Sequence, residues 1–277
     1  MTSWWNKNVE TRINDFKSWT GDFNQPSKIY CRNYIVSKQY KNIIDCGCGL
    51  ATDYFGFKND GHEINYTGLD SCKYLIDLNR SNGMAMIEAE LNADLPLSDN
   101  SYECVYCREV LEHLPYYEKT IKEFVRIASK EIMIVFFIKP LEENEWVEEI
   151  KNKIEKQKKE RQDAKVKQEE EKRKLAEEAG IEFVPDPEEP ETEIIIKEEE
   201  KEINYWKEED LYHNKYDKKK LESFIMSLPK VDKLFWANLN DFGYVSVVAP
   251  DETPKNETVQ STADLTNNKF ILHILLK

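Results

Sequence analysis

The chain has 277 residues, with 53 acidic and 39 basic side chains and a formal net charge of −14 at pH 7. This acidity disfavours a protein that binds a long polyanion. Nucleic acid remains an alternative partner only because Lys and Arg occur at 28–41 and 215–220. There is no run of 18 apolar residues and no apolar segment behind the N-terminus, so we expect a soluble, cytoplasmic protein without membrane insertion.

The segment 1–40 is rich in aromatic side chains, with Lys and Arg between them. These aromatic residues are Trp4, Trp5, Phe16, Trp19, Phe23, Tyr30 and Tyr34. We expect this segment to form a helical cap over the edge of the domain that follows. Its rings would either stack on a ligand or pack in the core.

Between residues 41 and 140, short apolar runs alternate with helical stretches. The expected strands are 42–47, 64–70, 84–91, 102–107 and 131–138. The run 131–138 shows no polar alternation, which indicates a strand that is buried on both faces. Residues 117–129 carry an apolar stripe with helical spacing. Alternating strands and helices predict an α/β fold with a parallel sheet that is covered on both sides.

The segment 141–203 differs in composition, and we interpret it as a charged helical insertion. Residues 145–178 are mostly Glu, Lys, Gln, Arg and Ala, which are strong helix formers, and their sparse apolar positions hold no heptad. Residues 192–197 are expected to add a small strand. The insertion is a candidate surface for a protein partner or for oligomerisation.

The core pattern resumes in the segment 204–277. An amphipathic helix is expected at 217–228, strands are expected at 233–239 and 270–277, and a short extra strand is expected at 244–248. No helix separates these last strands, so we expect them to pair antiparallel at the edge of the sheet.

Five cysteines lie in or beside expected strands and tight turns, where buried thiols are common: Cys46, Cys48, Cys72, Cys104 and Cys107. Cys104 and Cys107 have the C-x-x-C spacing of metal and redox sites. On a strand, however, positions three apart face opposite sides, and no second pair accompanies them. We therefore expect reduced, structural thiols.

A glycine turn follows the first expected strand and reads D-C-G-C-G-L-A from Asp45 to Ala51. Gly47 and Gly49 would let the backbone bend sharply and approach a ligand. The second strand ends at Asp70, where a carboxylate can accept both hydroxyls of a ribose. The turn lacks the third glycine of a dinucleotide site, and Asp45 would repel a pyrophosphate but suit a cationic ligand. This pattern favours S-adenosylmethionine (SAM) over NAD.

Four motifs in order resemble those of class I SAM-dependent methyltransferases. They read I-I-D-C-G-C-G-L-A, Y-T-G-L-D, E-L-N-A-D-L-P-L-S-D-N-S-Y-E-C-V and E-V-L-E-H-L. The resemblance covers roughly 42–138 and continues more weakly at 211–240 and 270–277. It implies a Rossmann-like, seven-stranded α/β sheet, mostly parallel with an antiparallel C-terminal hairpin, and SAM as the methyl donor.

The resemblance also implies which residues hold the donor. Asp70 would take the ribose hydroxyls, with Ser71 beside it. Either Glu90 or Asn92 would accept a hydrogen bond from the adenine amino group, and Leu91 would pack against the ring. The methionine part would lie along the glycine turn and the end of the fourth strand, at Asp45, Gly47, Cys48, Gly49, Cys107 and Arg108.

The stretch E-V-L-E-H contains Glu109, Glu112 and His113, which share one face if a helix begins near residue 108. Together with His213, this pattern resembles Mg²⁺-dependent O-methyltransferases, which act on small-RNA 3′ ends and on ubiquinone precursors. The resemblance implies that the four residues bind Mg²⁺, and that Glu112, His113 and His213 are catalytic. In such sites the ion chelates two hydroxyls and a histidine takes the proton. The alternative is structural, with Glu109 capping a helix and His213 at the surface.

The resulting hypothesis is a SAM-dependent O-methyltransferase that acts on a small molecule, with a sugar or glycan vicinal diol as the expected acceptor. One alternative is RNA ribose 2′-O-methylation, which shares the metal chemistry but should show a basic track. The other is an inactive methyltransferase fold that recruits a protein partner.

Overall fold

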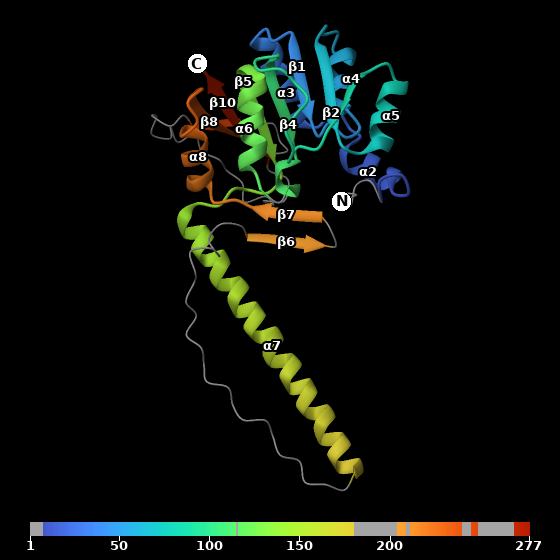
Figure 1. Cartoon of the computed structure of the whole chain (residues 1–277), viewed down its shortest axis with the longest axis vertical. Coiled ribbons are helices and arrows are strands. Elements are labelled where there is room, and N and C mark those ends of the chain that lie inside the picture. Colours follow the sequence, from blue (N-terminus) through green and yellow to red (C-terminus); the bar gives the residue numbers. More distant parts are fainter. Residues whose placement is uncertain (1–7, 115, 180–203, 209–210, 240–244, 249–268) are drawn as a thin grey trace.

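Eight strands form one sheet in the residues that the structure describes, which are 8–114, 116–179, 204–208, 211–239, 245–248 and 269–277 of this computed structural model (Figure 1). The strand order is β3-β2-β1-β4-β5-β10-β8-β9. The strands are β1 (Asn42–Cys46), β2 (Asn65–Asp70), β3 (Ala85–Glu88), β4 (Tyr102–Arg108), β5 (Ala128–Phe136), β8 (Val231–Leu239), β9 (Val245–Val248) and β10 (Lys269–Leu276).

Strands β1 to β5 are parallel, as the alternation of strands and helices predicted. The last strand, β10, lies between β5 and β8 and is antiparallel to both. It is buried along its centre, because its F-I-L-H-I-L-L run has an apolar neighbour on each side. The predicted α/β fold with antiparallel C-terminal strands is confirmed, and the short strand β9 extends the expected seven strands to eight.

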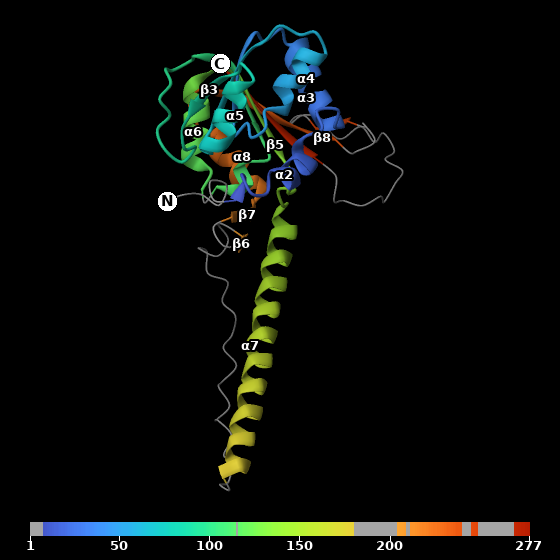
Figure 2. The ribbon, with the colours of Figure 1, turned by 90° about the vertical axis from the view of Figure 1, so that its right-hand side faces the viewer.

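Helices cover both faces of the sheet (Figure 2). One face carries α3 (Pro26–Ser37) and α4 (Thr52–Asn59), and the other carries α6 (Glu118–Ile127) and α8 (Lys218–Met226). The helix α5 (Lys73–Ser81) packs by the edge strands β2 and β3. Asp217 caps α8 by accepting a hydrogen bond from the Lys220 amide at 3.0 Å. Each face buries its own apolar core, because the side chains of these strands point alternately to the two faces.

All six cysteines are buried free thiols, as expected for five of them. Cys104 packs in the core under α3 and α4, whereas Cys107 packs in the core under α6 and α8. The C-x-x-C pair therefore faces opposite sides of β4 and cannot bind one metal ion.

A buried polar network fastens α3 to the centre of the sheet. The carboxylate of Glu131 on β5 accepts hydrogen bonds from Tyr40 at 2.7 Å and from Tyr34 of α3 at 3.3 Å. Its other oxygen lies 2.7 Å from Nδ1 of His273 on β10. Since Glu131 and His273 are fully buried, these contacts position α3 firmly against the strands.

The N-terminal cap contains α2 (Ile13–Thr20) ahead of α3. Ile13 and Phe16 of α2 pack with Val9, Cys72 and Leu75, so α2 lies over the end of β2. Trp4, Trp5 and the side chain of Trp19 lie outside the described residues. The helices α2 and α3 lie within the segment 1–40.

The charged segment forms the 37-residue helix α7 (Glu143–Ala179). At 1.5 Å per residue it is about 55 Å long. It extends away from the sheet in both views (Figures 1 and 2). The expected strand at 192–197 lies outside the described residues.

The sequence did not predict the antiparallel ribbon of β6 (Asn204–Glu208) and β7 (Leu211–Lys215), which lies beside the sheet near the base of α7. No described helix is long and apolar enough to cross a membrane.

Candidate active site

The turn after β1 approaches its neighbours so closely that both of its glycines are required. Gly47 has φ of 78°, and a Cβ there would lie 2.5 Å from a methyl group of Val110. Gly49 has φ of 54°, and a Cβ there would lie 3.2 Å from the ring of Phe16. Positive φ strains any other residue at both positions, and at Gly47 a side chain would also clash, so the turn presents bare backbone at this edge of the sheet.

Asp70, at the end of β2, holds the same turn. One carboxylate oxygen accepts from the Gly49 amide at 2.9 Å, and the other accepts from the Cys72 amide at 2.8 Å. Burial raises the pKa of Asp70, while these backbone donors act against that rise. A carboxylate oxygen can accept more than one hydrogen bond, so both oxygens retain capacity for ribose hydroxyls.

Asn79 of α5 is a turn-holding residue that the sequence did not predict. Its side chain is buried and donates to the Gly49 carbonyl at 2.8 Å. A single asparagine within a helical pattern carries no sequence signal for this contact, because the two residues meet only when α5 packs against the turn.

Asp45 lies at the end of β1 beneath the turn. Its Oδ2 accepts a hydrogen bond from the hydroxyl of Tyr66, whereas its buried Oδ1 has no hydrogen-bond partner. Burial raises the pKa of Asp45 to about 8, and the nearby Asp53 carboxylate adds to the rise. An unpaired buried acceptor costs about 1 to 3 kcal/mol, and a donor supplied by a ligand would remove that cost. The orphaned oxygen fits the ammonium group of the methyl donor.

The residues predicted for the adenine lie just beyond β3. Glu90 and Asn92 are exposed, whereas Leu91 is buried and its carbonyl accepts from the Thr120 hydroxyl at 3.0 Å. The β3 strand itself ends at Glu88, which pairs with Asp70 of β2. All of these residues therefore stand at the same edge of the sheet as the glycine turn.

Two predicted cofactor residues direct their side chains away from this edge. Cys48 packs against Gly68, and Cys107 packs in the core under α6 and α8. Burial raises the pKa of both thiols well above the ordinary value. These positions can offer only backbone to a ligand, while Ser71 lies beside Asp70 as its position in the sequence requires.

Arg108, at the end of β4, reaches across to the N-terminus of α3. Its Nη2 donates to Ser27 at 2.9 Å and to Glu109 at 2.8 Å, and it lies 3.4 Å from Gln25. Its Nη1 is buried and has no hydrogen-bond partner. The sequence predicted Arg108 for this edge but not its neighbours on α3, which include Lys28.

The helix expected from residue 108 onward is absent. β4 continues to Arg108, Glu109 adopts a left-handed conformation with φ of 55°, and only the short 3₁₀-helix η1 (Leu111–His113) follows. The argument that Glu109, Glu112 and His113 share one helical face is therefore wrong. Arg108 still pairs with Val135 in the β4–β5 ladder. The backbone at residue 108 is therefore that of a strand, and no helix can begin there.

Glu109 and Glu112 occupy different surroundings. Oε1 of Glu109 pairs with Arg108 and, at 2.9 Å, with Lys269. Burial alone would raise the pKa of Glu109, but these two cations outweigh it and the pKa is lowered. Glu112 is fully buried, and its Oε1 accepts from the Phe137 amide at 2.7 Å. Burial raises its pKa to about 8, and its Oε2 has no hydrogen-bond partner.

Histidines 113 and 213 come from segments that pack together. The ring of His113 lies 5.3 Å from that of Phe137, just after β5. The backbone of His213 is in β7, not in a loop, and pairs with Trp206 of β6. β7 is held against η1 because the Asn214 amide donates to the Leu114 carbonyl. The side chain of His213 lies outside the described part of the chain, and the described side chains include no group of three His, Cys, Asp or Glu residues arranged for a metal ion.

Two cavities of about 510 and 300 Å³ lie at the opposite, amino-terminal ends of β1 and β2. Both are lined by Lys41, His62, Glu63 and Ile64, and neither contains a predicted cofactor residue. The glycine turn is instead covered by α2, whose Phe16 stands over Gly49. We assign the candidate site to the turn because its unpaired buried groups indicate specific ligand chemistry.

Comparisons with known proteins bear on the domain and on the fold. Residues 44–136 match a family model described as a methyltransferase domain. The chain is similar to the magnesium protoporphyrin IX methyltransferase of Synechocystis PCC 6803, solved with bound SAH, with 12% identity, 99% and 97% of the two chains covered and a TM-score of 0.53. It is also similar to a SAM-dependent methyltransferase of Thermotoga maritima, described as a possible histamine N-methyltransferase, with 11% identity, 99% and 100% covered and a TM-score of 0.50. No curated protein sequence matches the chain. The chain therefore has the class I SAM-dependent methyltransferase fold, with a methyltransferase domain matched at residues 44–136.

Proposed function

We propose that this protein transfers a methyl group from SAM to a hydroxyl of a small molecule, and that the acceptor is a sugar-like vicinal diol. The observation that carries the donor assignment is the buried, unpaired Oδ1 of Asp45 beside a turn whose two glycines both have positive φ. An acid at this place suits a ligand with an ammonium group and opposes a pyrophosphate. The domain match at residues 44–136 supports the same assignment.

In this proposal the carboxyl edge of the sheet binds the donor from three strands. Asp45 accepts from the ammonium group, and Asp70 accepts from the ribose hydroxyls while it keeps its bonds to the Gly49 and Cys72 amides. The exposed Glu90 or Asn92 would meet the adenine amino group beside Leu91. When bound, SAM supplies a methyl group on a positively charged sulfur.

The acceptor would enter from the side of η1. His113 stands there against Phe137 and would take the proton of the attacking hydroxyl. Glu112 holds the loop after β4 to the loop after β5 through the amides of Phe137 and Ile138. This positions the acceptor side relative to the glycine turn, which is the geometric requirement for an in-line transfer.

Assistance by Mg²⁺ is a second candidate that one observation favours. Oε2 of Glu112 and Oδ1 of Asn214 are both buried without a hydrogen-bond partner, and hard cations prefer such oxygen ligands. Glu112, His113 and His213 would hold the ion, which would supply polarisation of two neighbouring hydroxyls. Glu109 fits this set less well, because Arg108 and Lys269 already neutralise its carboxylate.

Two alternatives predict different behaviour. An RNA ribose 2′-O-methyltransferase would act on short RNAs, although the chain is acidic overall. An inactive fold that recruits a partner through the exposed charges of α7 would fail to bind SAM. The acidic balance of the chain leads us to favour the small acceptor.

The test is methyl transfer from labelled SAM to a panel of free and nucleotide-linked sugars and short RNAs, with and without EDTA. We expect transfer to a sugar diol by the wild type and none by Asp70→Ala. Transfer that survives EDTA would reject the Mg²⁺ candidate only. Calorimetry that shows no binding of SAM or SAH by the wild type would reject the methyltransferase proposal itself.

A further inference from the structure

The larger of the two cavities, which we call the amino-terminal cavity, has a wall of aromatic rings. Its volume of about 510 Å³ lies in the range of small-molecule sites. The ring of Tyr66 lies 5.5 Å from that of Tyr54 and 6.2 Å from that of Phe57, and all three residues line the cavity. Phe57 and Tyr66 are buried, whereas Tyr54 is half-buried. The ring of Tyr54 is therefore the one that a ligand can cover, and aromatic pairs favour a planar ligand there.

The charged residues of the amino-terminal cavity favour an anion. Lys41 and Lys58 are exposed lysines that line it, and Glu63 is the one carboxylate among its lining residues. Two lysines against one glutamate, with His62 neutral, give the lining a net charge of +1. The ammonium group of Lys58 lies 4.4 Å from the centroid of the Tyr54 ring. A positive charge thus stands beside the ring that a ligand can cover.

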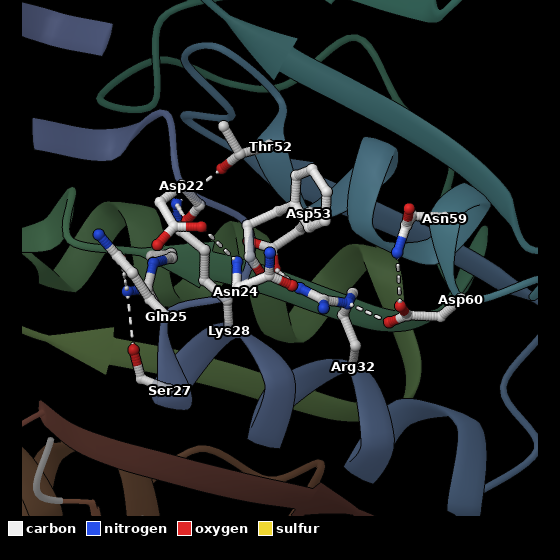
Figure 3. Close-up of polar contacts among 12 residues, drawn as sticks. Asp22, Asn24, Gln25, Ser27, Lys28, Arg32, Thr52, Asp53, Asn59 and Asp60 are labelled. Atoms are coloured by element: carbon white, nitrogen blue, oxygen red, sulfur yellow. Dashed lines mark hydrogen bonds and ion pairs between the residues drawn. The ribbon is translucent and has the colours of Figure 1, made fainter. Parts of the chain in front are cut away.

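The rim of the cavity is fixed where α4 ends. Gly61 has φ of 74°, and the amide of His62 donates to the Phe57 carbonyl at 2.9 Å, so the chain leaves the helix in a defined cap. Just before this cap, the Asp60 carboxylate accepts from Nε of the buried Arg32 of α3 at 3.0 Å (Figure 3). The carboxylate of Asp60 therefore faces Arg32, and this contact holds the rim of the cavity in place.

One side chain of the cavity wall reaches the candidate active site. The hydroxyl of Tyr66 donates to Oδ2 of Asp45, whose Oδ1 is the buried oxygen without a partner. Burial raises the pKa of Tyr66 well above its ordinary value, so its hydroxyl stays protonated and remains a donor. A ligand ring that packs against the aromatic wall would hold the Tyr66 hydroxyl on Oδ2. The same arrangement leaves Oδ1 as the acceptor for a ligand at the glycine turn.

We propose that the amino-terminal cavity is an effector site for a planar aromatic anion, and that Tyr66 couples its occupancy to Asp45. The ring of the effector lies against Tyr54, and its anionic group pairs with Lys41 and Lys58. The coupling rests on the proposed function, because it requires Asp45 to bind the ammonium group of the donor, whereas the anion site does not. Coupling between two sites is reciprocal, so the effector and the donor should each strengthen binding of the other.

The test begins with three probes that separate the ring from the charge. They are 2-naphthoate, the uncharged 2-naphthalenemethanol, and decahydro-2-naphthoate, which keeps the carboxylate on a saturated, puckered ring. Calorimetry on the full chain should show that the wild type prefers 2-naphthoate to the alcohol by about tenfold, the effect of two exposed ion pairs. It should prefer 2-naphthoate to the saturated acid by about fivefold, the effect of one aromatic pair. Equal binding of the three probes, or no binding, would overturn the proposal.

Lysine variants then assign the probe to this cavity. Lys41→Met and Lys58→Met should each weaken binding of 2-naphthoate by about threefold and leave binding of the alcohol nearly unchanged. The matched control is Lys119→Met, which removes an exposed lysine from α6 on the opposite face of the sheet and should bind 2-naphthoate as the wild type does. If both cavity variants also bind it as the wild type does, the probe lies elsewhere and the proposal fails.

Titrations of S-adenosylhomocysteine (SAH) with and without saturating 2-naphthoate measure the coupling. We expect the wild type to bind SAH about fivefold more tightly with the probe present. Tyr66→Phe, which keeps the ring and removes the hydroxyl, should still bind 2-naphthoate but bring this ratio to one. Weaker binding of SAH with the probe present would mean that the two compete for one site, which overturns the proposal. Equal affinities in the wild type would refute the coupling.

Folding and donor binding are controlled separately. Thermal unfolding checks each variant, and the two lysines are exposed, so their replacement should not unfold the chain. If Tyr66→Phe unfolds, the ratio of SAH affinities in the wild type and the lysine variants decide the proposal without it. A wild type that binds 2-naphthoate but neither SAM nor SAH would refute the proposed function, and with it the coupling, while the anion site stands.

Discussion

Val110 lies directly against Gly47, so that a Cβ on Gly47 would come within 2.5 Å of a Val110 methyl group. The loop after β4 thus closes onto the turn after β1, and Asp45 lies just ahead of that turn. This single contact joins the loop that we propose for the acceptor to the turn that we propose for the donor. It makes the geometry of one loop depend on the other.

Gly47→Ala should therefore destabilise the fold by about 2 to 4 kcal/mol, the sum of a left-handed alanine and an overpacked contact. SAH binding should be lost as well. Gly83→Ala is the matched control, because Gly83 also has positive φ, at 79°, but a Cβ there would meet nothing within 4 Å. Denaturant unfolding and calorimetry measure both effects. Equal losses in the two variants would show that backbone strain alone, without the Val110 contact, explains the glycine.

Val110→Ala should rescue part of the Gly47→Ala defect, because it removes the methyl groups that the new Cβ would strike. We expect the double variant to be more stable than Gly47→Ala by at least about 1 kcal/mol, the usual scale of coupling between residues in contact. Additive losses in a double-mutant cycle would contradict a direct contact.

Binding of SAH should release protons near neutral pH. The pKa of Asp45 is about 8 in the free protein, so its carboxyl is mostly protonated at pH 7 and must ionise to accept an ammonium group. Affinity should rise by up to about tenfold per pH unit between pH 6 and 7.5. Calorimetry in two buffers with different ionisation enthalpies measures the release, and Asp45→Asn should abolish it. Identical enthalpies in the two buffers for the wild type would refute this role.

Glu112 should make the fold less stable as pH rises. Its pKa is raised by burial to about 8 in the folded state, so the folded state binds more protons than the unfolded chain between roughly pH 4.5 and 8. The free energy of unfolding must fall with pH in that window, by at most about 1.4 kcal/mol per unit for one group. Asp45 acts in the same direction. Denaturant melts should show a shallower slope for Glu112→Gln.

Glu160→Gln is the control for that experiment, because it removes one carboxylate from an exposed position on α7. It should leave the slope unchanged. An unchanged slope in Glu112→Gln as well would mean that Glu112 is ionised in the folded protein, as a bound cation would require.

Replacing residues 148–202 by a short Gly/Ser linker should leave the sheet intact, because the described side chains of α7 beyond its first turn are mostly exposed. We expect a change of less than about 1 kcal/mol in the free energy of unfolding, as for surface substitutions. Loss of near-UV circular dichroism with retained helical signal would show that the segment contributes to the core.

Periodicity and residue type in the sequence determined the succession of strands along the chain, the positions of the glycine turn and of Asp70, and the long charged helix. These features follow from local patterns: apolar runs form strands, acids follow them, and strong helix formers continue for many turns. The tertiary structure decided what such patterns do not encode. It ended β4 in a left-handed Glu109 instead of a helix, because the ladder to β5 continues through Arg108. It also brought Asn79 to Gly49 and Lys28 to Thr52, contacts between residues 30 and 24 positions apart that exist only once the helices pack.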